Sequence, residues 1–206
     1  MITVIKSQFV QHKLTILRNK KTSNTVFRQT MNETSYLIAA EVLKHLPYKK
    51  TKVETPLKST SGTILAKQII LVPILRAGLG LLEGFAKFLP DAEKGHIGLY
   101  RDEQTYEPVE YLFKLPKIRN KKILILDPML ATGNSSIAAI DLIRNKGANI
   151  KDISLISLLA APEGLKNIQK KQKGIHIFTC SIDKKLNKNK FIVPGLGDAG
   201  DRYMGT

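Results

Sequence analysis

The stretch ILILDPMLATGNSS, residues 123–136, decides the fold of this 206-residue chain. Residues 123–126 form a continuous apolar run, which predicts a short strand buried on both faces. A turn of small residues follows from Asp127, and apolar residues then recur with helical spacing over residues 135–146. Gly147 supplies the helix stop. A strand, a turn and a helix in this order predict an α/β fold with a doubly wound, mainly parallel sheet.

The turn and the helix start beyond this strand have the features of an anion site. A helix start leaves backbone N–H groups unpaired and carries positive partial charge, so a phosphate fits there. Gly133 allows close approach of the backbone, and Thr132, Ser135 and Ser136 offer hydroxyl donors. Because a carboxylate repels phosphate, we expect Asp127 to face sugar hydroxyls or a metal ion. The stretch predicts a sugar-phosphate site, although many such turns in α/β proteins bind nothing.

The stretch IILVPILRAGLGLLEG, residues 69–84, repeats the same order of elements. It predicts a buried strand over residues 69–75, a tight turn over 76–78 and a helix over 79–89. Arg76 stands at the carboxyl end of this strand, where its guanidinium fork suits a phosphate. A surface arginine at a turn is the alternative interpretation.

A hairpin is predicted next, with strands over residues 96–101 and 109–114. Its loop, residues 102–108, is polar and acidic, and Arg101 stands at its base. A hairpin of this length suits a lid that closes on a substrate. A plain surface hairpin is the alternative.

The remaining chain predicts further helices and strands around this centre. Residues 7–48 predict two helices, and the longer one, over 24–46, has an apolar stripe for core or subunit contact. The stripe of this longer helix consists of Val26, Phe27, Met31, Tyr36, Leu37, Ala40, Leu43 and Leu46. Residues 52–57 predict a short edge strand. A strand, a helix and a strand are predicted over residues 153–160, 162–173 and 175–180.

The composition is that of an ordinary soluble globular protein, with 43% hydrophobic and 24% charged residues. Every apolar run is interrupted well before the length of about 18 residues that a membrane span needs. The first residues lack an apolar core followed by a small-residue cleavage site, so we expect no secretory signal. The single cysteine, Cys180, suits a reducing cytoplasm and is expected to be a small apolar strand residue, not a nucleophile.

The net charge of +16 raises the question of a nucleic-acid partner. The chain has 26 lysines, seven arginines and no tryptophan, whereas base recognition favours arginine and aromatic platforms. We therefore interpret the charge as a solvated surface that also attracts a polyphosphate substrate, and a regulator that binds RNA is the alternative.

The last stretch, FIVPGLGDAGDRYMGT, residues 191–206, is rich in glycine yet carries too many apolar residues for a frayed end. An ordered glycine-rich backbone exposes N–H and C=O groups to a small planar ligand. Such groups can match the acceptor–donor–acceptor edge of uracil, and a fixed N–H donor opposite position 4 would reject cytosine. This segment therefore predicts a site for a small planar ligand.

Four stretches resemble, in the same order, the uracil phosphoribosyltransferases of the type I phosphoribosyltransferase superfamily. They are residues 72–84, 96–116, 123–135 and 192–205. Pro128 stands where the superfamily usually has a second acid, and Glu103 stands where the hairpin of the family usually has proline. The resemblance implies a single domain over residues 1–206, with a flexible β-hairpin lid and a C-terminal hood. Its parts are N-terminal helices at about 7–48, a core at about 52–180 and a hood at about 181–206, to which N-terminal residues contribute.

The resemblance also implies an activity, its cofactor and its partners. The 5-phosphoribosyl group of 5-phosphoribosyl 1-diphosphate would pass to N1 of uracil, giving UMP and diphosphate in pyrimidine salvage. Mg²⁺ would be carried mainly by the diphosphate, without a direct protein ligand, and GTP is an allosteric activator of some members. The family suggests a cytoplasmic homodimer or larger homo-oligomer, with neither a membrane nor a nucleic-acid partner. A phosphoribosyltransferase for orotate or a purine is a further alternative.

The site residues implied by the resemblance fall into three groups. Arg101 and Asp198 would be catalytic. Uracil would be bound by Ile192, Gly197, Asp198 and Ala199. Phosphoribosyl diphosphate would be bound by Arg76, Arg101, Asp127, Pro128, Met129, Leu130, Ala131, Thr132, Gly133, Asn134, Ser135 and Asp198.

Overall fold

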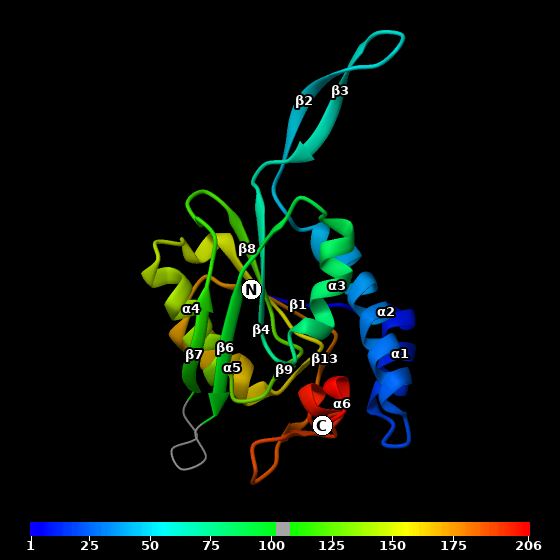
Figure 1. Cartoon of the computed structure of the whole chain (residues 1–206), viewed down its shortest axis with the longest axis vertical. Coiled ribbons are helices and arrows are strands. Elements are labelled where there is room, and N and C mark those ends of the chain that lie inside the picture. The colour runs from blue at the N-terminus through cyan, green and yellow to red at the C-terminus, as the bar shows by residue number, and fades with distance from the viewer. Residues whose placement is uncertain (102–107) are drawn as a thin grey trace.

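A mostly parallel sheet of eight strands forms the centre of the computed structural model, which describes residues 1–101 and 108–206 (Figure 1). The strand order is β1-β12-β10-β8-β4-β6-β7, and β5 also pairs with β4. Strand β7 runs antiparallel to β6. The strands are β1 (Ile2–Val4), β4 (Ile69–Leu75), β5 (Glu93–Lys94), β6 (His96–Arg101), β7 (Pro108–Lys114), β8 (Lys122–Leu126), β10 (Ile153–Ile156) and β12 (His176–Thr179).

Helices cover both faces of this sheet, as the doubly wound prediction requires (Figure 1). One face carries α1 (Gln8–Arg18), α2 (Asn24–Leu43) and α3 (Leu79–Phe88), and the other carries α4 (Asn134–Asn145) and α5 (Pro162–Lys171). Successive side chains of a strand point to opposite faces. In β8, Leu124 and Leu126 pack with the first group of helices, and Ile123 and Ile125 pack with the second.

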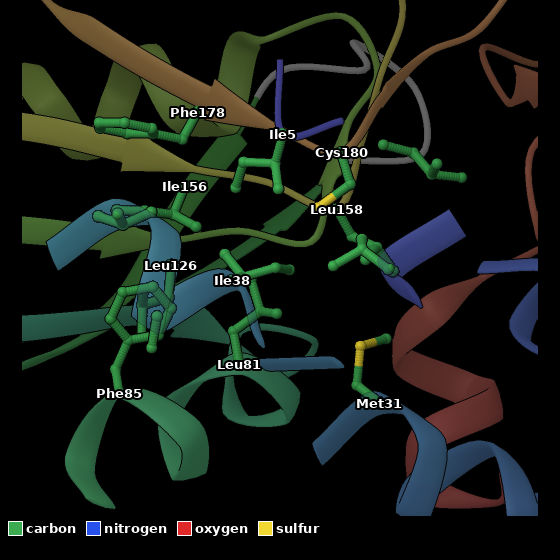
Figure 2. Close-up of a cluster of buried hydrophobic side chains, with 14 of the residues drawn as sticks. Ile5, Met31, Ile38, Leu81, Phe85, Leu126, Ile156, Leu158, Phe178 and Cys180 are labelled. Atoms are coloured by element: carbon green, nitrogen blue, oxygen red, sulfur yellow. The ribbon is translucent and has the colours of Figure 1, made fainter. Parts of the chain in front are cut away.

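Figure 2 shows the core on the first face, where helix and strand side chains meet. Ile38 of α2 and Leu81 and Phe85 of α3 lie in one cluster with Leu126 and Phe178 of the sheet. Full burial of each such side chain contributes about 1.5–3 kcal/mol relative to exposure. The two clusters together hold the sheet and fix its strand ends, where the candidate site lies.

The predicted elements around the centre are confirmed, with small shifts at their ends. Strands β4 and β6 have the predicted bounds, and Gly147, at φ +96°, follows α4 as the predicted stop. Helix α2 ends at Leu43, and its predicted apolar stripe is wrong at one end, since Val26 is 46% exposed. The buried side of α2 also includes Thr34 and Ser35, because close packing on α3 requires small residues there.

The short edge strand predicted over residues 52–57 is confirmed only at residues 52–54, because this region is half of a long hairpin. Strands β2 (Tyr48–Glu54) and β3 (Ser59–Leu65) pair along their whole length and project from the body of the molecule (Figure 1). Both faces of the hairpin are largely exposed, so its sequence lacks the alternation that marks a half-buried strand. The polar residues 58–62, expected to be a connection, mostly belong to β3.

The predicted single strand over residues 153–160 is wrong, because the chain leaves the central sheet after Ile156. It enters a second small parallel sheet of β9 (Met129–Leu130), β11 (Leu159–Ala160) and β13 (Ser181–Ile182). At the point where the chain passes from one sheet to the other, Leu158 N and Leu159 N both donate to Pro128 O, each at 3.0 Å. An apolar run cannot reveal such a break, because both sheets are buried.

The C-terminal segment is ordered and folds back on the helices. It contains β14 (Lys185–Leu186), β15 (Ile192–Val193) and α6 (Ala199–Met204). The remaining short element of the chain is the 3-10 helix η1 (Ile150–Asp152), which precedes β10. Asn24 Nδ2 of α2 donates to Arg202 O at 2.6 Å, and Tyr203 OH bonds to Asn32 Oδ1 at 3.1 Å. Helix α6 is thereby attached to α2 (Figure 1).

Cys180 takes the structural place expected of it, and His176 of β12 is also held by its neighbours. Cys180 is buried, and burial raises the pKa of its thiol to about 12. His176 bonds to Thr3 Oγ1 at 2.8 Å and stacks on Phe178. Within the described residues, no helix combines the length and apolarity needed to cross a membrane.

Replacing Gly84 with alanine should destabilise the protein, although alanine is favoured over glycine in a helix by about 0.8–1 kcal/mol. A Cβ at Gly84 would overlap Ser35 of α2. We expect a net loss of about 1–3 kcal/mol in the free energy of unfolding, measured by urea titration. Lys87→Ala, on the exposed side of α3, is the control and should change stability by less than about 0.5 kcal/mol. Equal or higher stability of Gly84→Ala would contradict this packing.

Candidate active site

The candidate site lies where β4 and β8 end beside each other. The two strands pair in parallel up to Pro73 and Leu126. The chain leaves β4 for a helix on one face and leaves β8 for a helix on the other, so a crevice opens between their carboxyl ends. The peptide bond between Leu75 and Arg76 is cis. Gly78 packs so closely that a Cβ would overlap Leu126 O, which keeps the two turns together.

The turn after β8 is held from below by α5. Gly133 adopts φ +81° and stands at the N-cap of α4. At Gly164 of α5, a Cβ would overlap Ala131 O, so the loop lies directly on that helix. Asn167 Nδ2 donates to Thr132 O at 2.9 Å and bonds to Asn134 Oδ1 at 3.0 Å. The α4 N-terminus therefore has a loop of fixed shape in front of it.

Asp127 lies at the floor of this crevice and bonds to the start of α4. Ser136 Oγ donates to Asp127 Oδ2 at 2.8 Å. Burial raises the pKa of Asp127 to about 6, although hydrogen bonds from Ser136 and from the backbone of Met129 act in the opposite direction. The buried hydroxyl of Ser136 thus binds the carboxylate, and although Ser136 also lines the cavity in this crevice, its contact with a phosphate stays a prediction.

A cavity of about 400 Å³ occupies the crevice. It brings together most of the residues predicted to bind phosphoribosyl diphosphate. These are Arg76, Asp127, Met129, Ala131, Thr132, Gly133, Ser135 and Asp198. Residues from both turns and from the C-terminal segment therefore surround one space.

Three predicted residues of the loop do not line this cavity. Pro128 is buried, and its carbonyl accepts from the strand beside it. Leu130 belongs to the core on the α4 face, and Asn134 bonds to Asn167. Their side chains support the loop, and contact of their backbone with a ligand stays a prediction.

A second cavity, of about 370 Å³, adjoins the first and contains all four residues predicted to bind uracil. Ile192, Gly197, Asp198 and Ala199 line it together with Phe191. The two cavities share five lining residues, Ala77, Met129, Ala131, Asp198 and Gly200. Asp198 is also the N-cap of α6, where its Oδ1 accepts from Asp201 N at 3.0 Å.

Of the two predicted arginines, Arg76 lines the first cavity. Arg76 Nη2 forms an ion pair with Asp201 Oδ1 at 2.9 Å, and both side chains are about half exposed. Arg101 ends β6, where its backbone pairs with Pro108. The predicted lid over residues 102–108 lies, except for Pro108, outside the described residues.

Several lining residues were not predicted from the sequence. Tyr100 and Tyr111 line the first cavity with their ring centroids 6.4 Å apart. The resemblance covers both tyrosines, so they could have been singled out. Asn167, which supports the loop but does not line the cavity, could not, because it stands in an ordinary amphipathic helix 35 residues from Thr132.

The residues present fit a magnesium ion that is carried by a substrate. No group of three His, Cys, Asp or Glu side chains suited to a metal occurs in residues 1–101 and 108–206. Asp127 and Asp198 line the same cavity, however, and Mg²⁺ binds with one or two carboxylates, waters and substrate phosphates. A diphosphate would therefore supply most of the ligands.

Comparison with known proteins agrees with this geometry. The family model of uracil phosphoribosyltransferase matches residues 4–206. This chain belongs to the uracil phosphoribosyltransferase family. A curated uracil phosphoribosyltransferase of Streptococcus salivarius is 49% identical over 205 residues, which are 98% of this chain and 97% of the relative.

Solved structures extend the likeness to the fold. A protein from Aquifex aeolicus matches with a TM-score of 0.92 and 37% identity, covering 98% of this chain and 97% of that one. A hypoxanthine-guanine phosphoribosyl transferase of L. donovani matches with a TM-score of 0.50 and 11% identity, covering 78% of this chain and 84% of the other. At that identity the likeness concerns the fold alone, and it agrees with the predicted phosphoribosyltransferase-like sheet.

Replacing Asp127 with asparagine should stabilise the protein at neutral pH. The native pKa of about 6 lies above the ordinary value of 3.8, so the carboxylate costs stability as the pH rises from about 4 to 6. Asp127→Asn removes that cost, and we expect a gain of about 1–3 kcal/mol at pH 7.5 that vanishes near pH 4. Urea unfolding across this pH range measures it. Asp91→Asn, at an exposed position, should show no such gain, and a pH-independent difference for Asp127→Asn would contradict the assignment.

Proposed function

We propose that this protein transfers the 5-phosphoribosyl group of 5-phosphoribosyl 1-diphosphate to N1 of uracil, giving UMP and diphosphate. The observation that carries the proposal is the pair of adjoining cavities, one at a helix N-terminus and one in the hood, which meet at Asp198. A transfer reaction requires two substrates whose reacting atoms meet at such a boundary. The protein would act as one phosphoribosyltransferase domain over residues 1–206.

The first cavity would hold the phosphoribosyl group. Its 5-phosphate would occupy the loop at the start of α4, where Thr132 and Ser135 line the cavity at the positive end of the helix. Asp127 would accept hydrogen bonds from the ribose hydroxyls, because its carboxylate lines the same cavity and would repel the phosphate. Arg76 and Arg101 would bind the diphosphate.

The second cavity would hold uracil. Backbone groups of residues 197–199 would pair with the base edge, and Ile192 would pack on its ring. A fixed N–H donor opposite the 4-oxo group would reject cytosine, which has an amino group at that position.

The reaction breaks the bond between C1 of ribose and the diphosphate oxygen and forms the bond from C1 to N1 of uracil. The electron pair of the broken bond stays with the diphosphate, whose growing charge Arg76 and Arg101 would stabilise. Mg²⁺ bound to the diphosphate would neutralise part of the same charge. Asp198 lies between the cavities and would help uracil N1 to lose its proton.

An assay with several bases tests the activity. The protein is incubated with phosphoribosyl diphosphate, Mg²⁺ and, separately, uracil, cytosine, orotate, hypoxanthine or adenine, and nucleotide and diphosphate are quantified. We expect UMP from uracil and a rate at least tenfold lower for every other base. Arg76→Ala, which removes a side chain proposed to bind the diphosphate, should reduce UMP formation and so tie the activity to this site. No UMP from uracil would reject the proposal, and nucleotide from another base would identify a different phosphoribosyltransferase. GTP activation and a cytoplasmic location stay predictions, and adding GTP to the same assay tests the first.

We further propose a homodimer or larger assembly in which the β2–β3 hairpin contacts a second copy. Leu57 at its tip is 95% exposed, and Tyr48, Val53 and Ile64 are each more than 40% exposed. A projecting element with several exposed apolar side chains is typical of a protein–protein contact.

Leu57→Asp combined with Val53→Asp should lower the molar mass measured by light scattering towards that of one chain, 23.0 kDa. The reason is that a charge in an apolar contact is desolvated without a partner. Phe9→Asp changes an exposed apolar residue of α1 instead, and should leave the mass unchanged. A lower mass for Phe9→Asp alone would place the contact on the N-terminal helices.

A further inference from the structure

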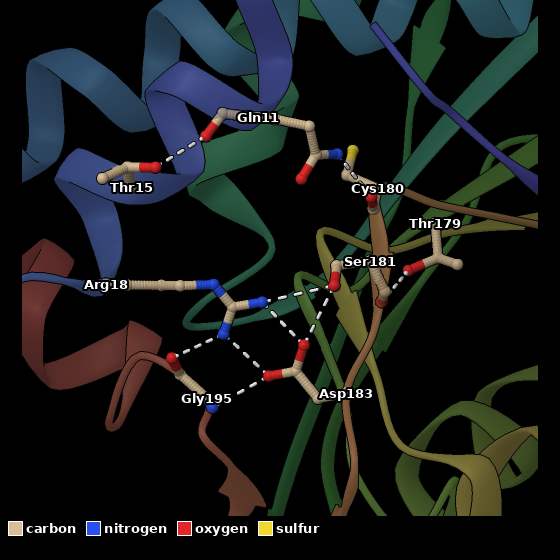
Figure 3. Close-up of polar contacts among 8 residues, drawn as sticks. All are labelled: Gln11, Thr15, Arg18, Thr179, Cys180, Ser181, Asp183 and Gly195. Carbon is tan, nitrogen blue, oxygen red and sulfur yellow. Dashed lines mark hydrogen bonds and ion pairs between the residues drawn. The ribbon is translucent and has the colours of Figure 1, made fainter. Parts of the chain in front are cut away.

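Residues 195–196, which precede the lining residues of the second cavity, are hydrogen-bonded by charged side chains of distant elements. Arg18, at the end of α1, reaches across to the hood (Figure 3). Its Nη1 donates to Gly195 O at 2.8 Å and to Asp183 Oδ2 at 2.7 Å, and its Nη2 donates to Asp183 Oδ1 at 2.6 Å. One guanidinium thus binds a carboxylate with both nitrogens and a backbone carbonyl with one of them.

Asp183 completes the contact with the same glycine. Gly195 N donates to Asp183 Oδ2 at 2.8 Å, and Ser181 Oγ donates to Asp183 Oδ1 at 3.0 Å. Both backbone groups of Gly195 are therefore bound by the Arg18–Asp183 pair. The Asp183 side chain is 2% exposed and that of Arg18 is 25% exposed, so solvent competes weakly for these bonds.

A second arginine fixes the next residue. Arg202 Nη1 donates to Leu196 O at 2.7 Å and also to Leu17 O, and its Nη2 donates to Asn19 O at 2.8 Å. Its guanidinium lies 4.3 Å from the ring centroid of Phe27. The end of α1 and residues 195–196 are therefore joined by two arginines with charge-assisted hydrogen bonds, which are about twice as strong as neutral ones.

These contacts are made to Gly195 and Leu196, which directly precede three residues that line the second cavity. Gly195 and Leu196 are buried and do not line the cavity, whereas Gly197, Asp198 and Ala199 do. Since φ and ψ are the only soft dihedrals of the backbone, fixing the peptide groups of Gly195 and Leu196 limits the direction in which the next N–H and C=O groups point.

We propose that Arg18 and Asp183 form a positioning pair that orients the base-recognising backbone of residues 197–199. This role rests on the proposed function, in which those residues bind uracil. The pair touches no substrate and acts through Gly195. Its effect should therefore fall on recognition of the base. Most of the phosphoribosyl site is built by the turns after β4 and β8, and Asp198, which both cavities share, is also held by the hydrogen bond from Asp201 N at 3.0 Å.

Steady-state kinetics of Arg18→Lys and Asp183→Asn test the proposal. Lysine keeps a positive charge opposite Asp183 but lacks the planar fork that also reaches Gly195 O. Asparagine keeps the shape of Asp183, but it has no charge and only one side-chain oxygen to accept the hydrogen bonds from Arg18 and Gly195. We expect the KM for uracil to rise at least tenfold in each variant. The kcat at saturating uracil and the KM for phosphoribosyl diphosphate should stay within about threefold of the original protein.

Lys13→Ala is the matched control, because Lys13 also belongs to α1 and forms an ion pair, but with Glu33 of α2 at 2.6 Å. It should leave all three kinetic constants within twofold. This control separates orientation of the hood from a general loss of stability at α1, which thermal melting of all variants also monitors.

Three results would overturn the proposal. They are a uracil KM within twofold of the original protein in Arg18→Lys, a parallel rise of both KM values, and an equal rise in Lys13→Ala. If Asp183→Asn melts below the assay temperature, Arg18→Lys alone carries the test, because it retains the charge pair. Failure of the proposed function is seen separately, since the unchanged protein would then form no UMP.

Discussion

The parallel pairing of β4 with β8 is the constraint on which the rest of the structure depends. Their apolar residues are buried on both faces, and the pairing places two turns side by side at the carboxyl ends. Gly78 and Gly133 allow these turns to lie against other backbone without a Cβ in the way. The crevice, the helix start of α4 and the cluster of polar side chains around them all follow from this contact.

The two cavities differ in the charged side chains beside them. The first cavity contains a carboxylate, Asp127, whose burial raises its pKa to about 6, which is a cost to folding at neutral pH that a bound ligand can offset. In the hood, Asp183 pairs with Arg18 of α1 next to Gly195, and the two charges compensate each other. Burial opposes ionisation of Asp183, yet bonds from Arg18, Gly195 and Ser181 keep its pKa below the usual value.

The sequence predicted well wherever burial leaves a local pattern. The apolar runs at residues 69–75 and 123–126 are strands, because a strand covered on both faces needs apolar side chains at every position. The β2–β3 hairpin was missed since neither of its faces is buried by the described residues. The apolar run over 153–160 was predicted as one strand for the opposite reason, because its two halves are buried in two different sheets.

The sequence by itself determined the alternation of strands and helices, the turn and helix start after β8, and an ordered glycine-rich segment at the C-terminus. Only the tertiary structure decided that these parts surround two adjoining cavities that share Asp198. It alone joined Arg18 to Asp183, which are 165 positions apart, and Asn167 to the loop after β8. The physical reason is that local patterns report burial and backbone preference, whereas hydrogen bonds between distant side chains exist only after the chain has packed.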